Sequence, residues 1–491
     1  MYWSRTGSYF DIASYLVLTA TWWVGGYLLV RFAFRLRPCE HLLAGLGTGW
    51  LLFIVLSNVL GQFIPLTAAY WLAAGSIGAA GCLFAWHSRQ CIWPERDTLR
   101  TWPQLLVFLL LTALFAAINR GLAIFDDYFN LPIVSRLAVG ELPPKFPLDI
   151  TSRLNYHYGL HLYAASLVRL AGLFPWSAFD LSKALSQALA PLLAFIWFRR
   201  ATHSATGGWI GAILVTLGGG ARWLLLILPE NTLQQIGEGM QLMGSAAASG
   251  PDLYTVLASP WKIEGGPPLP LPFAFTNGVF LPLPLAITSA GAMPQLTFLL
   301  LLLLARRTWR ASQGILYGLI LASLALTAEH LFVIFLLGLV LTACLHLLVR
   351  KKPHNVLSWL WPILTTLGLA AFAGGVLTEM LRGIFLQLFG SGAWQPTGSR
   401  DFAGFTLQWP PTLLSAHLGP LSLGNPRHIT AAFAELGPAL LFAPWVTIRS
   451  LHEARQGNWS QAAWGLGAAF GFVISLFLRY TSERDISRLP A

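Results

Sequence analysis

Long apolar runs separated by short Arg-rich connectors dominate the pattern of this chain, and the clearest occupy 105–117, 298–305 and 331–348. A run of about 20 apolar residues crosses the hydrocarbon core as a helix, because lipid offers no partner for exposed backbone N–H and C=O groups. Windows of about 19 residues predict roughly twelve spans. Their approximate limits are 12–31, 42–61, 66–86, 104–121, 178–198, 207–228, 287–305, 313–328, 330–349, 356–378, 430–449 and 461–479.

Composition agrees with a membrane protein. Hydrophobic residues make up 55% of the chain and charged residues 10%, whereas roughly 25% of residues are charged in an average soluble domain. Mean hydropathy is +0.62. We therefore expect an all-α, polytopic integral membrane protein with about twelve transmembrane helices. The spans 313–328 and 330–349 also fit one kinked helix plus a re-entrant piece.

Basic residues gather in alternate connectors, and this asymmetry predicts orientation. Arg and Lys near span ends are retained on the cytoplasmic side, so we expect the long connectors 122–177, 229–286 and 379–429 to lie outside, as do both termini. The formal charge of +11 then reflects orientation, and no contiguous basic patch with interleaved aromatics indicates nucleic acid. The basic connector residues are Arg31, Arg35, Arg37, Arg89, Arg96, Arg100, Arg199, Arg200, Arg306, Arg307, Arg310, Arg350, Lys351, Lys352, Arg449 and Arg455.

The sequence lacks the common metal-binding, nucleotide-binding, hydrolase and haem-ligating motifs. The four cysteines form no CxxC pair, so neither a disulfide framework nor a zinc site is indicated. No GxGxxG, P-loop, HExxH or GxSxG motif occurs, and apolar spans carry no paired histidines of the kind that ligate haem. We therefore expect no haem, flavin or nucleotide cofactor.

The first candidate site is the motif Phe125-Asp126-Asp127-Tyr128-Phe129-Asn130, directly after the fourth span. Two adjacent carboxylates at a bilayer boundary repel one another and lose hydration, and a bound cation, an Arg partner or a catalytic proton relieves that cost. Such a pair suits a Mg²⁺ or Mn²⁺ site or a general base. The alternative is a solvated loop acid followed by a helix cap.

The second candidate is the stretch 156–163, which reads YHYGLHLY and begins an apolar segment that ends near residue 173. We expect an interfacial helix or a short re-entrant span here. On a helix His157 and His161 share a face, so Tyr156, His157, Tyr158 and His161 are candidates for substrate binding. The alternative is an ordinary aromatic belt at the membrane interface.

Glu329 and His330 form a third candidate between two apolar spans. An ionisable pair at membrane depth is costly and usually faces a cavity or a partner, which favours Glu329 as a catalytic group and His330 as a substrate contact. A mutual Glu-His hydrogen bond without a catalytic role is the alternative. Arg136 and Arg153 flank the first two motifs, and they are candidates to hold an anionic headgroup or diphosphate.

The order of these features resembles the GT-C superfamily of membrane glycosyltransferases, and in particular its protein mannosyltransferase group. The resemblance covers about 104–378, which contains seven spans, and rests on the span 104–121, the pair Asp126-Asp127, the run YGLHLYAASLVRLAG at 158–172 and a span that ends in Arg199-Arg200. It implies three parts: a three-span segment 1–103, the GT-C-like module 104–378, and an outer loop with two further spans over 379–491.

The resemblance also implies a function. We expect transfer of a sugar from a polyprenyl-phosphate-linked donor to an acceptor at the extracytoplasmic face of a membrane, which we take to be a bacterial plasma membrane. Asp126 or Asp127 then acts as general base or metal ligand, and His157 and Glu329 orient the acceptor or the phosphate. The expected partners are the lipid-linked donor and membrane lipids. Two alternatives stay open: a transporter or flippase, and a non-catalytic subunit of a membrane complex.

Overall fold

A computed structural model describes most of the chain as helices. The described residues are 8–89, 93–122, 124, 127–147, 149–154, 156–262, 268–276, 290–306, 309–350, 359–379, 381–382, 405–415, 417–437, 439–456 and 458–480. Within this part the strands form only four two-stranded sheets. The prediction of an all-α class is therefore confirmed.

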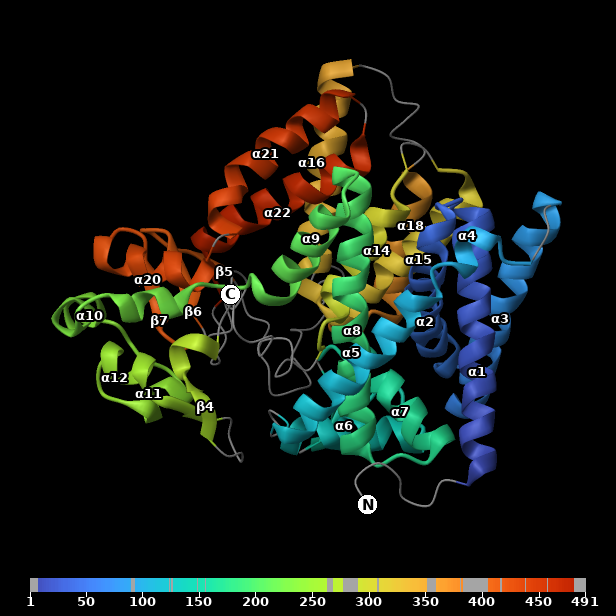
Figure 1. The fold of residues 1–491 in the computed structure, drawn as a ribbon, viewed down its shortest axis with the longest axis horizontal. Helices are drawn as coiled ribbons and strands as arrows, with labels where there is room; N and C mark the ends of the chain where they lie inside the picture. Colours follow the sequence, from blue (N-terminus) through green and yellow to red (C-terminus); the bar gives the residue numbers. More distant parts are fainter. Residues whose placement is uncertain are drawn as a thin grey trace, which may run out of the picture. The chain divides into compact units, whose positions relative to one another are not determined.

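The chain divides into two compact units. Unit 1 comprises Met1–Ala212, Thr288–Phe332 and Lys352–Ser399, and unit 2 comprises Ile213–Ile287, Val333–Lys351 and Arg400–Ala491. Each unit is assembled from segments that are far apart in the sequence, as the colours along the chain in Figure 1 show.

The helices of unit 1 follow the apolar runs (Figure 1). They are α1 (Tyr9–Leu28) with the π-helical turn η1 (Leu29–Ala33), η2 (Pro38–Glu40), α2 (His41–Gly61), α3 (Leu66–Ser88), α4 (Arg96–Leu99), α5 (Trp102–Gly121), α6 (Asp127–Val139), α7 (Gly159–Ala171), α8 (Pro175–Thr202), α14 (Met293–Leu304), α15 (Ala311–Thr327) and α18 (Leu360–Ala373). The strands β1 (Lys145–Phe146) and β2 (Asp149–Arg153) form a small hairpin between α6 and α7.

Two helices run from one unit into the other, namely α9 (Ala205–Leu217) and α16 (Glu329–Arg350). Unit 2 otherwise contains short elements and two longer helices. They are η3 (Arg222–Ile227), α10 (Glu230–Gly237), α11 (Ser245–Ser249), α12 (Leu253–Ala258), β3 (Pro260–Lys262), β4 (Pro268–Pro272), η4 (Phe273–Thr276), β5 (Phe405–Leu407), β6 (Thr412–Ser415), β7 (Gly419–Ser422), α20 (Pro426–Leu436), α21 (Ala439–Gln456), α22 (Trp459–Phe477) and β8 (Leu478–Tyr480).

Five helical segments are long and apolar enough to cross a membrane, judged by length and composition. They are Tyr9–Ala33, Pro38–Gly61, Leu66–Ser88, Arg96–Gly121 and Pro175–Thr202. Six further apolar helices in the described part are shorter. These segments fit an integral membrane protein, whereas the expected count of twelve spans is not confirmed.

Two of the expected spans are wrong as continuous helices. In the span expected at 207–228, α9 ends at Leu217 and the chain resumes as the 3-10 helix η3, because three consecutive glycines follow and glycine stabilises a helix poorly. In the span expected at 430–449, α20 ends at Gly437, whose φ of 61° is left-handed. The Ala221 N–H donates to the Ala434 carbonyl at 2.8 Å, so the two breaks support one another. The stretch 311–350, in contrast, forms two helices that Ala328 separates.

Glycines allow the first three helices to pack closely. A Cβ atom added at Gly26 of α1 would lie 2.2 Å from the Gly45 carbonyl oxygen of α2, and one added at Gly81 of α3 would lie 2.8 Å from the Gly25 carbonyl oxygen of α1. Backbones approach this closely only where side chains are absent, as is common between membrane helices. A larger residue at these positions would separate α1 from α2 and α3.

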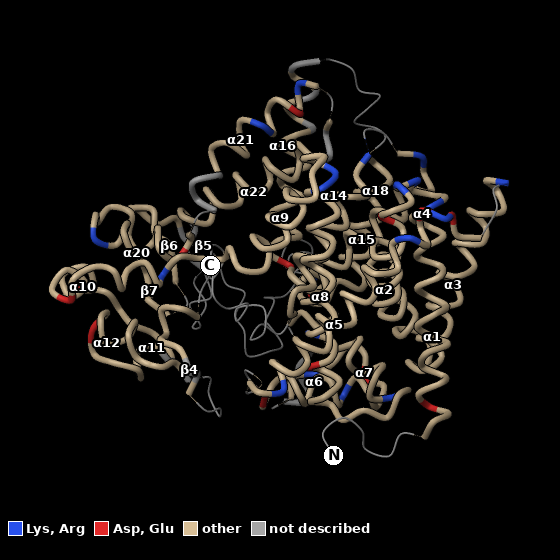
Figure 2. The backbone as a smooth tube through the Cα atoms, viewed as in Figure 1, with Lys and Arg blue, Asp and Glu red and all other residues tan. Residues whose placement is uncertain are grey.

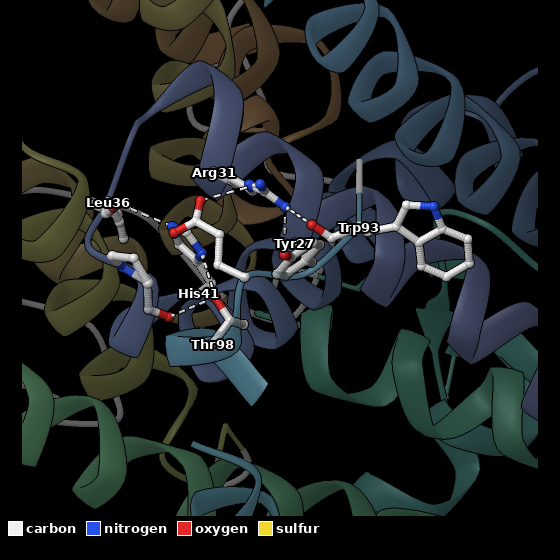
Figure 3. A network of polar contacts seen from close by, with 8 residues as sticks. Tyr27, Arg31, Leu36, His41, Trp93 and Thr98 are labelled. Carbon is white, nitrogen blue, oxygen red and sulfur yellow. Dashed lines mark hydrogen bonds and ion pairs between the residues drawn. The ribbon is translucent and has the colours of Figure 1, made fainter. Parts of the chain in front are cut away.

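The Arg-rich connectors of unit 1 meet at one end of the bundle. After α1, Arg31 donates to the Trp93 carbonyl at 2.7 Å and to Glu95 at 3.2 Å in the connector after α3. His41 at the start of α2 contacts Thr98 Oγ1 at 3.3 Å and the Leu36 carbonyl at 3.0 Å. Figure 3 shows this network between the ends of α1 and α2 and the segment around α4. We call this the Arg-rich end of unit 1.

Further contacts bring two other connectors to the same end. Arg200 of α8 donates to the Leu303 carbonyl of α14 at 3.1 Å, and Gln313 of α15 donates to the Ala33 carbonyl at 2.7 Å. Arg306 donates to the Phe34 carbonyl. Figure 2 shows that the Lys and Arg residues of unit 1 lie mainly near the helix ends and leave the helix middles largely uncharged, as apolar surroundings require.

Candidate functional site

Polar side chains also converge at the other end of unit 1, where α5 ends and α8 begins. There α6 and α7 lie side by side across these helix ends (Figure 1). The residues concerned come from α6, from α7 and the segment directly before it, from α8 and from the start of α16. We define the polar cluster as Asn130 of α6, His157, His161 of α7, Asp180 and Lys183 of α8, and Glu329 of α16.

His161 occupies the centre of the polar cluster. Its side chain is fully buried, and its Nε2 lies 2.8 Å from Asn130 Oδ1. The ring stacks on Phe179 with centroids 4.9 Å apart. With the Asn130 oxygen as acceptor, Nε2 carries the proton and Nδ1 has the lone pair.

Burial determines the protonation state of His161. Desolvation lowers its pKa well below the usual 6.5, and electrostatic interactions with His157 and Lys183 lower it further. The imidazole is therefore neutral at neutral pH. Within the described part of the chain, Nδ1 is buried and has no hydrogen-bond partner. This nitrogen can therefore accept a proton, although it is shielded from solvent.

His157 and Glu329 form the second part of the polar cluster. His157 Nδ1 lies 3.3 Å from Glu329 Oε2, and both side chains are mostly buried. A carboxylate at Nδ1 orients an imidazole ring. The His157 ring also stacks on Tyr156 with centroids 4.0 Å apart, and Tyr156 lies edge-on to His161 at 6.3 Å.

The third part is an ion pair within a predicted membrane span. Lys183 Nζ lies 3.8 Å from Asp180 Oδ1, with side-chain exposures of 4% and 2%. The Lys183 ammonium also lies 4.7 Å from the centre of the Phe179 ring, on which His161 stacks. Asn119 of α5 donates to the Asp180 carbonyl at 3.1 Å and so ties α5 to α8.

Asp127 lies one helical turn from the polar cluster. It is the first residue of α6, its side chain is exposed, and its Oδ1 accepts a hydrogen bond from the Tyr128 N–H at 2.6 Å. Residues three apart share a helix face, so Asp127 lies on the same side of α6 as Asn130, which contacts His161. Asp126 lies outside the described residues.

The expected metal site is not complete in the described part of the chain. No group of three or more His, Cys, Asp or Glu side chains there is arranged to hold a metal ion. Asp127 alone offers two oxygens, whereas Mg²⁺ and Mn²⁺ sites use six oxygen ligands, several of them waters or substrate phosphates. The described residues therefore do not fit a metal held by protein side chains, and no catalytic step below depends on one.

The stretch 156–163 differs from the expected helix at its start. Helix α7 begins at Gly159, so His157 precedes the helix, and the prediction that His157 and His161 share a helix face is wrong. A Cβ atom at Gly159 would lie 2.9 Å from Thr327 Cγ2, which shows how closely α7 approaches the end of α15. The two histidines meet instead through Tyr156.

Tyr158 has structural contacts. It is buried, and its hydroxyl donates to Asn58 Oδ1 at 2.9 Å, while Asn58 donates to the Ala373 carbonyl at 2.7 Å. Burial raises the pKa of Tyr158 well above its usual value. Tyr158 therefore stays protonated and links α2 and α18 to the segment before α7.

The remaining candidates are Arg136, Arg153 and His330. No described side-chain hydrogen bond or ion pair joins them to the polar cluster. Arg136 forms an ion pair with Glu141 at 3.2 Å, so its charge is already compensated. The backbone of Arg153 pairs with Lys145 in the β1–β2 hairpin, and its side chain is outside the described part. His330 is exposed and interacts electrostatically with Glu329 and His157.

Sequence reasoning missed Asp180 and Lys183. Both lie inside the span expected at 178–198, three residues apart on one helix face, and a charged pair within a span is itself a signal of function. Asn130 was part of the acidic motif, but nothing in the sequence connected it with His161.

Comparisons with known proteins do not assign the chain to a family. No model of a known protein family, no curated protein and no solved structure matches it. The functional argument therefore depends on the polar cluster and on the motifs of the sequence.

Proposed function

We propose that the chain is a glycosyltransferase of the GT-C type, which moves a sugar from a polyprenyl-phosphate donor to an acceptor hydroxyl at the membrane surface. The observation that carries the proposal is the polar cluster itself. A neutral buried imidazole, a carboxylate–imidazole pair and the acidic start of α6 lie together at one end of a helical bundle. Buried titratable groups with shifted pKa values gather at functional sites, and charged groups inside membrane spans often mark substrate or proton pathways.

The proposed reaction requires a base and a stabilised leaving group. The acceptor oxygen attacks the anomeric carbon, the bond between that carbon and the phosphate oxygen breaks, and its electron pair leaves with the polyprenyl phosphate. The acceptor hydroxyl loses its proton to a carboxylate or an imidazole. No redox partner is needed.

We assign the base to the acidic start of α6. Asp127 is exposed and can reach an acceptor from solution, and Asp126 is its immediate neighbour in the sequence. His157, held by Glu329 at 3.3 Å, then orients the acceptor or the donor phosphate. His161 and Lys183 are positioning residues, because both are buried behind this surface.

The site is proposed to face outward. The polar cluster lies at the end of unit 1 opposite the Arg-rich end, since α5 and α8 each run between the two. Arg-rich connectors are retained in the cytoplasm. The donor would therefore be used on the extracytoplasmic side, where polyprenyl-phosphate sugars can enter from the lipid.

One observation favours a second function. The buried Asp180–Lys183 pair in α8 is of the kind that transporters use to couple substrate movement to protons. A transporter or flippase of a lipid-linked anion would move its substrate without breaking the bond between sugar and phosphate. Product analysis therefore separates the two functions.

The decisive experiment is a transfer assay with the full-length protein in lipid nanodiscs and a panel of polyprenyl-phospho-sugar donors. Replacing Asp127 or Asp126 with Asn should lower the rate by about 100-fold or more, because loss of a general base costs 10²–10⁴-fold. The control is Asp11→Asn, which replaces a partly exposed acid in the first turn of α1. Full activity in both Asp127→Asn and Asp126→Asn would refute the assignment of the base.

Orientation is tested by cysteine labelling. With the native cysteines replaced by serine, Asp127→Cys and Arg100→Cys should react with an impermeant maleimide from opposite sides of the membrane, because they lie at opposite ends of unit 1. Labelling of Asp127→Cys from the cytoplasmic side would reverse the proposed orientation without bearing on the transfer chemistry.

A further inference from the structure

A cavity opens at the Arg-rich end of unit 1, away from the polar cluster. Its volume is about 250 Å³, and Arg37, Glu40, Arg199, Arg200 and His203 contribute to its lining. The lining comes from the start of η2 and α2 and from the end of α8. None of these residues takes part in the proposed transfer reaction.

Local backbone structure places the basic side chains around the cavity. Arg37 precedes η2, and its N–H donates to Glu40 Oε2 at 3.1 Å. His203 ends α8 with a φ of 55°, so the chain turns sharply and leaves Arg199 and Arg200 on the last turn of the helix. Arg200 is held by the Leu303 carbonyl at 3.1 Å.

The cavity carries more positive charge than its own acid neutralises. Glu40 is only 2% exposed, and its Oε2 lies 3.8 Å from Arg200 Nη1, so it compensates one guanidinium. Arg37 and Arg199 remain, and neither forms an ion pair with a described residue. Their charges repel one another across a partly enclosed space.

Helix electrostatics explain only part of this arrangement. Arg199 and Arg200 lie at a helix C-terminus, where positive charge is stabilised by the helix dipole. Arg37 directly precedes η2, which leads into α2 at His41, and positive charge before the start of a helix is not stabilised by its dipole. A cation at that position, facing two others, is best stabilised by a bound anion.

We propose that this cavity binds the phosphate of an anionic phospholipid headgroup. Guanidinium groups match the geometry of phosphate oxygens, and basic pockets between membrane helices bind such headgroups. The lipid source is indicated by the neighbouring aromatic residues. The Arg199 guanidinium lies 5.4 Å from the Phe195 ring, which packs 4.8 Å from Trp209, and Trp209 is 52% exposed.

Trp209 and its neighbour Ile210, which is 53% exposed, supply an apolar surface next to the basic cavity. Tryptophan is enriched at the level of lipid headgroups, and α8 is long and apolar enough to cross a membrane. A headgroup in the cavity could therefore extend its acyl chains along the outer surface of α9. Free phosphate would gain nothing from this apolar surface.

The test is native mass spectrometry of the full-length protein titrated with phosphatidylglycerol or phosphatidylcholine. The double variant Arg37→Gln/Arg199→Gln should weaken phosphatidylglycerol binding by about 25-fold, since each basic residue near a lipid headgroup contributes roughly a factor of five. Phosphatidylcholine binding should not change. The matched control Arg96→Gln/Arg100→Gln removes two exposed arginines at the same end of unit 1 and should keep affinity within about twofold.

Two outcomes would overturn the proposal. Equal phosphatidylglycerol affinity of the wild type and the Arg37→Gln/Arg199→Gln variant would show that the cavity is not the site. Displacement of phosphatidylglycerol by millimolar inorganic phosphate, as completely as by excess lipid, would show that the source is free phosphate. If the double variant does not fold, Arg199→Gln alone should weaken binding about fivefold, and unchanged affinity would have the same adverse meaning.

Discussion

Each unit of this protein buries charged side chains, but the two sets have different surroundings. In unit 2, Arg222 donates to Glu435 at 3.2 Å and to Thr276 at 3.0 Å, and its guanidinium lies 4.0 Å from the Phe273 ring centre. In unit 1, Lys183 lies 3.8 Å from Asp180, and the neighbouring His161 keeps an unpartnered Nδ1 among the described residues.

The different surroundings of the buried charges distinguish a structural ion pair in unit 2 from a functional cluster in unit 1. Arg222 also has one nitrogen, Nε, without a partner in the described part of the chain, but a guanidinium is always protonated and cannot accept a proton. The Nδ1 lone pair of His161 can accept one. Buried groups that can change protonation therefore mark the unit 1 site, whereas Arg222 and Glu435 hold η3 against α20.

The largest expected effect is on the stability of unit 2. Arg222→Met should lower the free energy of unfolding by about 3–5 kcal/mol, because it removes the guanidinium that neutralises the buried Glu435 carboxylate. The double variant Arg222→Met/Glu435→Gln should recover most of this loss, since removing both charges is often nearly neutral. Denaturant titration of the detergent-purified protein measures both.

Its control is Arg427→Met, which breaks an exposed ion pair with Glu238 in the same unit. A surface pair contributes about 0–1 kcal/mol. If Arg427→Met and Arg222→Met destabilised the protein equally, the structural role of the buried pair would be wrong.

The next effect should be on activity rather than on stability. The double variant Asp180→Asn/Lys183→Met removes both charges of the unit 1 pair. Its free energy of unfolding should therefore stay within about 1–2 kcal/mol of the wild-type value. Removing the positive charge of Lys183 raises the pKa of His161, so the acid limb of the transfer rate should move to higher pH. The rate of transfer against pH measures this shift.

The matched variant in unit 2, Arg222→Met/Glu435→Gln, should leave that pH profile in place. Identical profiles for the two double variants and the wild type would mean that the Asp180–Lys183 pair is as structural as Arg222–Glu435. The contrast between the two units would then disappear.

The smallest expected effect is the pH dependence of stability. Burial lowers the pKa of His161 in the folded protein, whereas an unfolded histidine titrates near 6.5. As pH falls below about 6.5, His161 takes up a proton in the unfolded state but not in the folded state. The free energy of unfolding therefore decreases. Between pH 6.5 and 5 the decrease should be shallower for His161→Gln, as measured by denaturant titration.

For this measurement the control is His452→Gln, which replaces an exposed histidine of α21. It should retain the slope of the wild type. A wild-type slope in His161→Gln as well would show that other groups account for the acid sensitivity.

Much of the fold was predictable because its dominant signal is local. Apolar runs predicted α1, α2, α3, α5 and α8 close to their observed limits, since lipid admits little else than a helix. The predictions failed at 207–228 and 430–449, where glycines interrupt an apolar run. Glycine is nearly neutral on a hydropathy scale and barely lowers the average of an apolar window, but its backbone freedom ends the helix.

The candidate site was predictable only in parts. The motifs around Asp127, His157 and Glu329 attracted attention because charged and aromatic residues near span ends are unusual in an apolar sequence. The ion pair Asp180–Lys183 was overlooked inside a predicted span, although its spacing of three residues places both side chains on one helix face. The glycosyltransferase assignment itself stays a prediction.

Local sequence is enough to show that this chain is helical and apolar and that most of its charges lie between the spans, because those properties depend on residues near one another. The tertiary structure shows that Asn130 contacts His161, that His161 and Lys183 both contact the Phe179 ring, and that Glu329 reaches His157. Such meetings depend on how α6, α7, α8 and α16 pack. Helix packing is set by the shapes of whole surfaces, including close contacts such as that of Gly159 with Thr327, and no local pattern encodes it.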